Sequence, residues 1–257
     1  MLWRCHADFV SLSNSFFHFK QFSIQSQTKG LKVTTDACLL GRLAVHAQAR
    51  HILDIGTGTG VVALMLAQAN PEATITAIEI QNSVYEEAVL NVQSSPFAHR
   101  IQLIHNDFLK VEPVTYDLIV SNPPYFSEHL SGKNPEKNVA MHNTTLNHEQ
   151  LFAQVRLCMH EASKFYLILP SEISASRIEM AKGMGMYATS ITEIEKKKDI
   201  PYRRVICFSL KDEPLSRSKL ILQTDEGRQT DKFKELMQDY YLEDSSQYKK
   251  DKNTNSK

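Results

Sequence analysis

Glycine is concentrated at one place in this chain. Only nine of the 257 residues are glycine, and three of them, Gly56, Gly58 and Gly60, stand within five positions of one another. Glycine permits a tight turn and lets the backbone approach a ligand closely. A helix that begins at such a turn offers free N–H groups, and α/β folds bind nucleotide-like cofactors there. The segment DIGTGTG, which starts at Asp54, therefore predicts a cofactor-binding turn.

Two further acidic residues extend this prediction. Glu79 ends the next predicted strand, where its carboxylate can accept hydrogen bonds from two ribose hydroxyls. Asp107 follows the third predicted strand and is expected to bind an adenine amino group; the alternative is a local Asx turn in Asn-Asp-Phe. Together with Asp54 ahead of the glycines, this third acidic position favours S-adenosylmethionine as the cofactor.

The segment Asn122-Pro123-Pro124-Tyr125 follows the fourth predicted strand and suits chemistry on an amine. Its two prolines lack N–H donors and fix φ, so the loop is stiff and presents carbonyl groups. A planar amine is a poor nucleophile because its lone pair is delocalised. The side-chain carbonyl of Asn122 and the main-chain carbonyl of Pro123 can accept its hydrogens and aim the lone pair at a methyl-sulfonium, while Tyr125 stacks on the substrate. Catalysis would depend on positioning and electrostatics; the alternative is a proline-rich turn.

Strands and helices alternate along the chain, which predicts an α/β fold with βαβ units. The predicted strands are 51–56, 73–80, 100–105, 116–121, 165–170, 190–195 and 203–210. The predicted helices are 60–70, 83–94, 146–159 and 173–183. These elements predict a mostly parallel seven-stranded sheet, in which the last two strands add an antiparallel edge.

The composition is that of an ordinary soluble domain. Lysine plus arginine and aspartate plus glutamate number 29 each, so the net charge is zero with histidine neutral. The longest apolar run, 61–67, is far shorter than the roughly 20 residues of a membrane span, and the first ten residues do not resemble a signal peptide. The four cysteines form no CxxC pair and the histidines have no metal-ligand spacing, so we expect a cytoplasmic protein without a metal site.

The pairing of DIGTGTG with NPPY resembles the class I, S-adenosylmethionine-dependent amino-group methyltransferases. Two N-terminal segments, FKQFSIQ (19–25) and KVTTDACLLG (32–41), narrow the resemblance to the bacterial tRNA1(Val) adenine-N6-methyltransferases, which modify adenosine 37 beside the valine anticodon. The similarity extends over residues 16–243. It implies a Rossmann-like class I methyltransferase fold. Thr34 and Met141 depart from the family pattern, which usually has Gly and Arg at these positions.

The resemblance assigns roles to individual residues. The residues expected to hold the cofactor are Asp54, Gly56, Thr57, Gly58, Gly60, Glu79, Asp107, Phe108, Thr35 and Asp36. The residues expected to hold the target adenine are Asn122, Pro123, Pro124 and Tyr125. For Thr35 and Asp36 the alternative is a helix N-cap.

Basic residues gather in three segments of this neutral chain. Residues 16–32 carry three lysines and no acid among several phenylalanines, and residues 196–204 carry five basic residues against Asp199. Such patches can hold the phosphates of a tRNA anticodon stem-loop, whose target base must be unstacked to react. The alternative is solvated lysines and phenylalanines in the core. The residues predicted to contact RNA are Lys20, Lys32, Lys133, Lys137, Arg203 and Arg204.

The chain is expected to form one methyltransferase domain, 16–243, between an N-terminal extension, 1–15, and a lysine-rich, disordered tail, 244–257. No obligate protein partner and no membrane association are predicted. The alternatives are an NPPY methyltransferase of a protein glutamine amide or an rRNA base amine, and a non-catalytic cofactor- or RNA-binding module. A nicotinamide oxidoreductase also fits the glycine turn but leaves the NPPY segment without a role.

Overall fold

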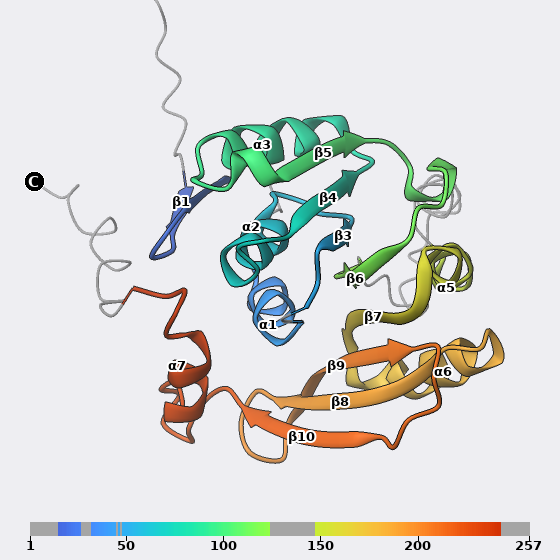
Figure 1. Ribbon diagram of the computed structural model, residues 1–257. Helices are drawn as coiled ribbons and strands as arrows, with labels where there is room; N and C mark the ends of the chain where they lie inside the picture. The colour runs from blue at the N-terminus through green and yellow to red at the C-terminus, as the bar shows by residue number, and fades with distance from the viewer. Residues whose placement is uncertain (1–14, 27–31, 45, 47, 124–146, 243–257) are drawn as a thin grey trace, which may run out of the picture.

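The computed structural model of the chain describes residues 15–26, 32–44, 46, 48–123 and 147–242, and its centre is an eight-stranded sheet (Figure 1). The strands of this sheet are β3 (His51–Ile55), β4 (Thr74–Glu79), β5 (Ile101–His105), β6 (Tyr116–Ser121), β7 (Met159–Pro170), β8 (Tyr187–Glu195), β9 (Pro201–Ser209) and β10 (Ser216–Ile221). The helices are α1 (Thr35–Leu43), α2 (Val61–Ala69), α3 (Asn82–Gln93), α5 (His148–Leu157), α6 (Ser171–Gly183) and α7 (Asp231–Met237). The strand order is β10-β8-β9-β7-β6-β3-β4-β5.

The five strands from β3 to β7 run parallel to their neighbours. This confirms the predicted α/β class and the mostly parallel, Rossmann-like sheet. Because the strands are parallel, their carboxyl ends meet at one edge of the sheet, where such folds bind ligands. The register places Ile55 of β3 beside Ser121 of β6, so the segments that follow these two strands leave the sheet side by side.

Two details of the predicted sheet are wrong. The sheet has eight strands and not seven, because β10 adds a parallel edge strand beside β8. Its sequence, SRSKLI, is polar and mostly exposed, so it carries no apolar run that would predict a strand. The antiparallel strand is also not at the edge: β9 lies between β7 and β8 and is antiparallel to both. Its buried run 205–209 is typical of an interior strand.

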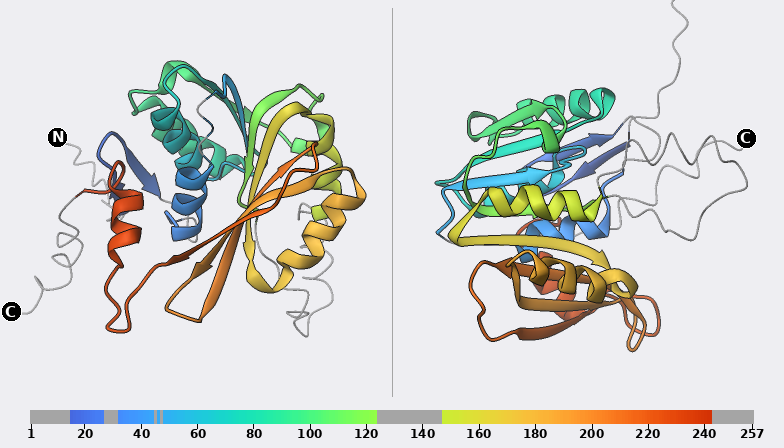
Figure 2. Two further views of the ribbon diagram at one scale, coloured as in Figure 1. Left: turned by 60° about the horizontal axis from the view of Figure 1, so that its bottom comes forward. Right: turned by 90° about the vertical axis from the view of Figure 1, so that its right-hand side faces the viewer.

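Helices cover both faces of the sheet. In the left view of Figure 2, α1 and α7 lie on one side of the sheet, and α5 and α6 lie on the other. The first face has a core that includes Leu40 and Leu64, and the second has a core that includes the packed rings of Phe152, Phe165 and Phe208. The three-layer arrangement holds the carboxyl edge of the sheet between two packed cores.

A two-stranded hairpin, β1 (Ser15–His18) and β2 (Ser23–Ser26), precedes the main sheet. Its phenylalanines separate into two groups: Phe17, Phe19 and Phe22 pack in or against the first core, whereas Phe16 is 43% exposed. The Lys20 N–H donates to the Tyr240 carbonyl at 2.8 Å, which joins this hairpin to the segment after α7. The core alternative therefore applies to most of these rings.

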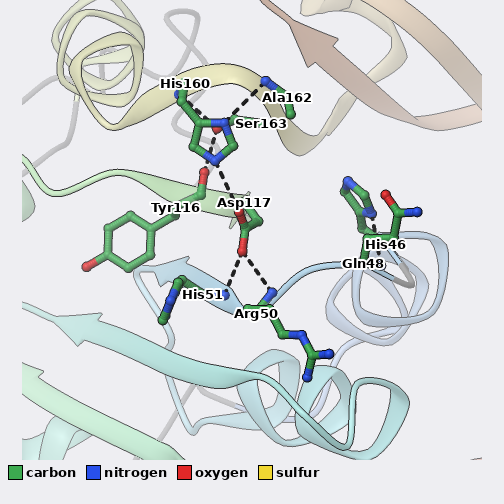
Figure 3. A network of polar contacts seen from close by, with 9 residues as sticks. All are labelled: His46, Gln48, Arg50, His51, Tyr116, Asp117, His160, Ala162 and Ser163. Atoms are coloured by element: carbon green, nitrogen blue, oxygen red, sulfur yellow. Dashed lines mark hydrogen bonds and ion pairs between the residues drawn. The ribbon is translucent and has the colours of Figure 1, made fainter.

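A polar network joins the amino ends of β3, β6 and β7 (Figure 3). Asp117 Oδ2 accepts hydrogen bonds from the backbone N–H groups of Arg50 and His51, at 2.8 and 2.9 Å. Its Oδ1 lies 3.1 Å from His160 Nε2, and the His160 N–H donates to Ser163 Oγ at 2.9 Å. One aspartate thus fixes the amino ends of three neighbouring strands, at the edge of the sheet away from the glycine turn.

Candidate active site

The glycine turn connects β3 to α2 in a left-handed backbone conformation. Gly56, Gly58 and Gly60 have φ angles of 69°, 59° and 85°, which side-chain-bearing residues rarely adopt. The N–H groups of Gly56 and Thr57 both donate to the carbonyl of Ile78, at 2.9 and 3.0 Å. The turn is therefore anchored to the end of β4, and the concentration of glycines has the backbone reason that the sequence predicts.

Asp54 lies beneath this turn and is 1% exposed. Its Oδ2 accepts a hydrogen bond from the Thr57 hydroxyl at 2.6 Å. Burial raises the pKa of Asp54 to about 7; hydrogen bonds from Thr57 and the Ala63 backbone oppose this increase, and negatively charged Glu79 adds to it. The carboxylate therefore fixes the turn from inside, and an added positive charge nearby would favour its ionised form.

Glu79 closes the other side of the turn. Its Oε2 accepts a hydrogen bond from the Gly58 N–H at 3.0 Å, and its Oε1 accepts one from the Gln81 N–H at 2.9 Å. The residue after it, Ile80, is 51% exposed. The sequence analysis did not select Ile80, because a single isoleucine has no pattern; its position directly after Glu79 is the signal that could have found it.

Asn91 of α3 is a second residue that the sequence analysis missed. Its side-chain amide donates to the Thr59 carbonyl in the glycine turn at 2.9 Å and to the Gln25 carbonyl of β2 at 3.0 Å. Its carbonyl accepts the Gln25 N–H at 2.8 Å. The hairpin and the glycine turn are therefore joined through one buried asparagine, which no local spacing rule could reveal.

Asp107 follows β5 and caps the short 3-10 turn Phe108–Lys110. Its Oδ1 accepts a hydrogen bond from the Leu109 N–H at 3.0 Å, so the Asx-turn alternative is realised. Its Oδ2 lies 3.8 Å from Lys110 Nζ, and its side chain is 24% exposed. Phe108 is buried in the second core, so its side chain packs there and does not face the sheet edge as an open surface.

Asn122 and Pro123 follow β6 at the level of the glycine turn. The Ser121 hydroxyl donates to the Ile55 carbonyl at 3.1 Å, which holds the ends of β6 and β3 together. Asn122 is partly buried and Pro123 is buried. The structure therefore brings the start of the NPPY segment next to Gly56. Pro124 and Tyr125 lie outside the described residues.

The start of α1 differs from the N-cap alternative. Thr34 is the cap, and its hydroxyl accepts the Ala37 N–H at 3.2 Å; Thr35 and Asp36 belong to the first helical turn. Thr35 is exposed, whereas Asp36 is buried and its Oδ2 lies 2.7 Å from Nε of Arg203.

The residues predicted to contact RNA have different environments. Lys20 and Lys32 are exposed, and Lys133 and Lys137 lie outside the described residues. Arg203 pairs with Asp36, and Arg204 lies 2.8 Å from Glu193 Oε1 and also donates to Ser174 Oγ at 2.9 Å. Both arginines therefore make ion pairs within the chain, which spacing alone could not show.

In the part of the chain that the structure describes, no helix is long and apolar enough to cross a membrane. Within the same ranges, no three His, Cys, Asp or Glu residues lie together in a way that could hold a metal ion.

Solved structures with this fold are methyltransferases. A predicted O-methyltransferase, Atu636 from Agrobacterium tumefaciens, superposes with a TM-score of 0.63 at 20% identity, covering 80% of this chain and 96% of that one. A methyltransferase from Pyrococcus furiosus has a TM-score of 0.56 at 22% identity, covering 74% of this chain and 89% of that one. At these identities the comparison supports the fold.

Sequence relatives are much more similar. The family model described as Methyltransferase small domain matches residues 29–188. A Bacteroides thetaiotaomicron protein named tRNA1(Val) (adenine(37)-N6)-methyltransferase is 37% identical over 234 residues, or 90% of this chain and 99% of the relative. A Pasteurella multocida protein of the same name is 36% identical over 238 residues, or 91% of this chain and 99% of the relative. The chain therefore belongs to the tRNA1(Val) (adenine(37)-N6)-methyltransferase family.

Proposed function

We propose that the chain transfers a methyl group from S-adenosylmethionine to the exocyclic N6 amine of adenosine 37 in a valine tRNA. The relatives' names supply this substrate. The observation that carries the proposal is the pairing of Ile55 with Ser121. Because these residues end adjacent strands, the glycine turn and Asn122 meet at one edge of the sheet, where a cofactor and a planar amine can be held in contact.

The residues at the turn fit an adenosine cofactor that carries positive charge. The carboxylates of Asp54 and Glu79 are buried and accept only uncharged O–H and N–H donors among the described residues. Both therefore attract a cation through surroundings of low polarity. We propose that Glu79 also meets the ribose hydroxyls, that Ile80 packs on the adenine ring, and that Asp107 accepts its amino group. When bound, the cofactor supplies an electrophilic methyl group on sulfur.

The amine is held by the segment after β6. We propose that the side-chain carbonyl of Asn122 and the backbone carbonyl of Pro123 accept the two N6 hydrogens and direct the nitrogen lone pair toward the glycine turn. Tyr125 stacks on the adenine, with Pro124 stiffening the loop. These residues provide orientation and hydrogen-bond acceptors, and the proton released from the methylated amine passes to water.

RNA binding requires contacts beyond the target base. We propose that the exposed side chains of Lys20 and Lys32, together with Lys133 and Lys137 after the NPPY segment, interact with tRNA phosphates. A tRNA substrate also implies that the protein acts in the cytoplasm, without an obligate protein partner.

The test is transfer of labelled methyl from S-adenosylmethionine to unmodified valine tRNA, using only the purified chain, followed by nucleoside analysis. The proposal expects 6-methyladenosine at position 37 and no label on a matched tRNA with guanosine at that position. Label in rRNA or in a glutamine-containing protein, with none in valine tRNA, would replace the substrate but keep the reaction class. Cofactor binding without transfer to any of these would support a non-catalytic module.

A further inference from the structure

Asp36 has a carboxylate that the chain uses on one side only. The residue is 6% exposed, and its Oδ2 accepts a hydrogen bond from Arg203 Nε at 2.7 Å. Its Oδ1 is also buried but has no hydrogen-bond partner in the part of the chain that the structure describes. Buried carboxylate oxygens are almost always hydrogen-bonded in folded proteins. An unused Oδ1 therefore indicates a donor that the protein itself does not provide.

The pair lies at the same edge of the sheet as the proposed reaction. Arg203 stands opposite Pro170, the last residue of β7. Earlier in β7, Leu167 pairs with Ser121, the residue before Asn122. Asp36 and Arg203 therefore lie beside the carboxyl ends of β6 and β7 and not at the Asp117 network.

The fold also joins α1 to the helix of the glycine turn. A Cβ on Gly41 of α1 would come within 2.9 Å of Met65 in α2, so the two helices are in close contact there. Since α2 begins directly after Gly60, α1 packs on an element that belongs to the proposed cofactor site. Asp36 is thus connected to that site through both its ion pair and its helix.

Arg203 has a fixed orientation. Its guanidinium carbon lies 4.1 Å from the centre of the Tyr202 ring, and its Nη1 donates to the Tyr202 carbonyl at 3.0 Å. A guanidinium is planar and stays charged, so holding its plane also fixes the direction of the Nε–H bond to Asp36. That bond determines which oxygen of Asp36 is occupied and which is available.

We propose that Arg203 is a positioning residue for the cofactor: it holds Asp36 Oδ2, so that Oδ1 accepts a hydrogen bond from the α-ammonium group of S-adenosylmethionine. An ammonium group has donors only, which matches an oxygen that can only accept. The proposal rests on the proposed function, because it requires that cofactor. It also gives Arg203 a role different from the phosphate contact that the sequence analysis predicted.

The test compares two ligands that differ at the amino-acid end. S-adenosylhomocysteine has the α-ammonium group, whereas 5′-methylthioadenosine keeps the adenosine and the sulfur and lacks that end. In Arg203→Gln we expect the calorimetric Kd for S-adenosylhomocysteine to rise about tenfold, as for loss of one charge-assisted hydrogen bond. The Kd for 5′-methylthioadenosine should stay within about twofold of its wild-type value.

Three further variants show whether the effect passes through Asp36. Asp36→Asn should weaken S-adenosylhomocysteine binding by a similar factor, and the double variant should be no weaker than either single variant, because both remove one interaction. Arg203→Lys should recover part of the affinity. Arg204→Gln removes the neighbouring arginine, which pairs with Glu193, and should leave both ligand affinities unchanged.

The outcomes separate positioning from simple stabilisation. If Arg203→Gln weakens both ligands equally, or neither, Arg203 does not act on the ammonium group and the inference is wrong. If that variant does not fold by circular dichroism, Asp36→Asn and Arg203→Lys decide the same question with the same pair of ligands. A wild-type chain that binds neither ligand would overturn the cofactor proposal itself, whereas cofactor binding without tRNA methylation would overturn only the substrate.

Discussion

The two ends of the central sheet hold an aspartate in opposite ways. At the amino ends, partial burial alone would raise the pKa of Asp117, but the N–H groups of His51 and Arg50 and the nearby His160 hold it below its usual value (Figure 3). At the carboxyl ends, burial dominates and raises the pKa of Asp54 to about 7. One carboxylate is stabilised in its charged form by the chain, and the other is not.

This difference separates a structural role from a ligand-binding role. The amino-end aspartate connects three strands and uses both of its oxygens. At the carboxyl end, the partners of Asp54 and Glu79 are uncharged donors in the described part of the chain, so negative charge is left without a cation. Sites of function often keep such costly arrangements, because the ligand completes them. The comparison therefore predicts that changes at the two ends affect different properties.

The largest effect is expected for Asn122→Ala at the carboxyl end. Removing the side-chain carbonyl leaves the amine with one acceptor fewer, so methyl transfer to tRNA should fall by about 100-fold or more. The Kd for S-adenosylmethionine should change by less than about twofold, and the free energy of unfolding should stay the same within about 0.5 kcal/mol. Single-turnover transfer and calorimetry measure these quantities. Wild-type transfer by this variant would show that Asn122 does not position the amine.

The opposite outcome is expected for Asp117→Ala at the amino end. Loss of its hydrogen bonds should lower the free energy of unfolding by about 2 kcal/mol at neutral pH, while the folded variant keeps wild-type transfer. Because the folded-state pKa of Asp117 is lowered, its stabilisation is present above about pH 4 and is lost as the pH falls through the folded-state pKa. Urea unfolding should therefore show a smaller difference between variant and wild type at about pH 3 than at neutral pH. An equal difference at both pH values would contradict this origin.

Periodic segments with a buried face were predictable from the sequence. The alternation from β3 to α6 follows the expected ranges closely, because its strands and helices have long apolar patterns. β10 was not predictable because its residues are polar, and the hairpin because its phenylalanines have no clear period. Thr34, a departure from the family pattern, is the helix cap, which is a local role that threonine performs well.

Contacts between distant segments set the limit of prediction at the site. The glycine turn and Glu79 could be placed by spacing, since a strand, a turn and a helix fix their relation. The pairing of Asp36 with Arg203 joins residues 167 positions apart. The same holds for Asn91, which links β2 to the turn. No spacing rule in the sequence connects such residues, so only the fold reveals them.

A smaller effect is expected from Asp54→Asn, which tests the charge at the glycine turn. A positively charged cofactor favours ionised Asp54, so wild-type affinity should increase as the pH rises through about 7 and level off above it. The Asn variant should lack this increase. Because the folded-state pKa is raised, burying the charge of Asp54 costs stability as the pH rises from about 4 to 7, so the variant should unfold no more easily than wild type at about pH 8.

Parallel titrations of the two proteins with S-adenosylmethionine between about pH 6 and 8 decide the matter. Any ionisation of the ligand itself affects both proteins equally, so the difference between them reports on Asp54. If wild type and variant show the same pH dependence, the raised pKa has no part in cofactor binding.

The smallest effect is expected from Arg50→Ala in the amino-end network. Asp117 accepts the backbone N–H of Arg50 and not its side chain, which alanine leaves in place. The guanidinium makes only an exposed ion pair with Glu72 at 3.3 Å, and such pairs contribute little. The free energy of unfolding should fall by less than about 0.5 kcal/mol in urea titrations. A loss as large as that of Asp117→Ala would mean that the side chain of Arg50, and not its backbone, holds the strand ends together.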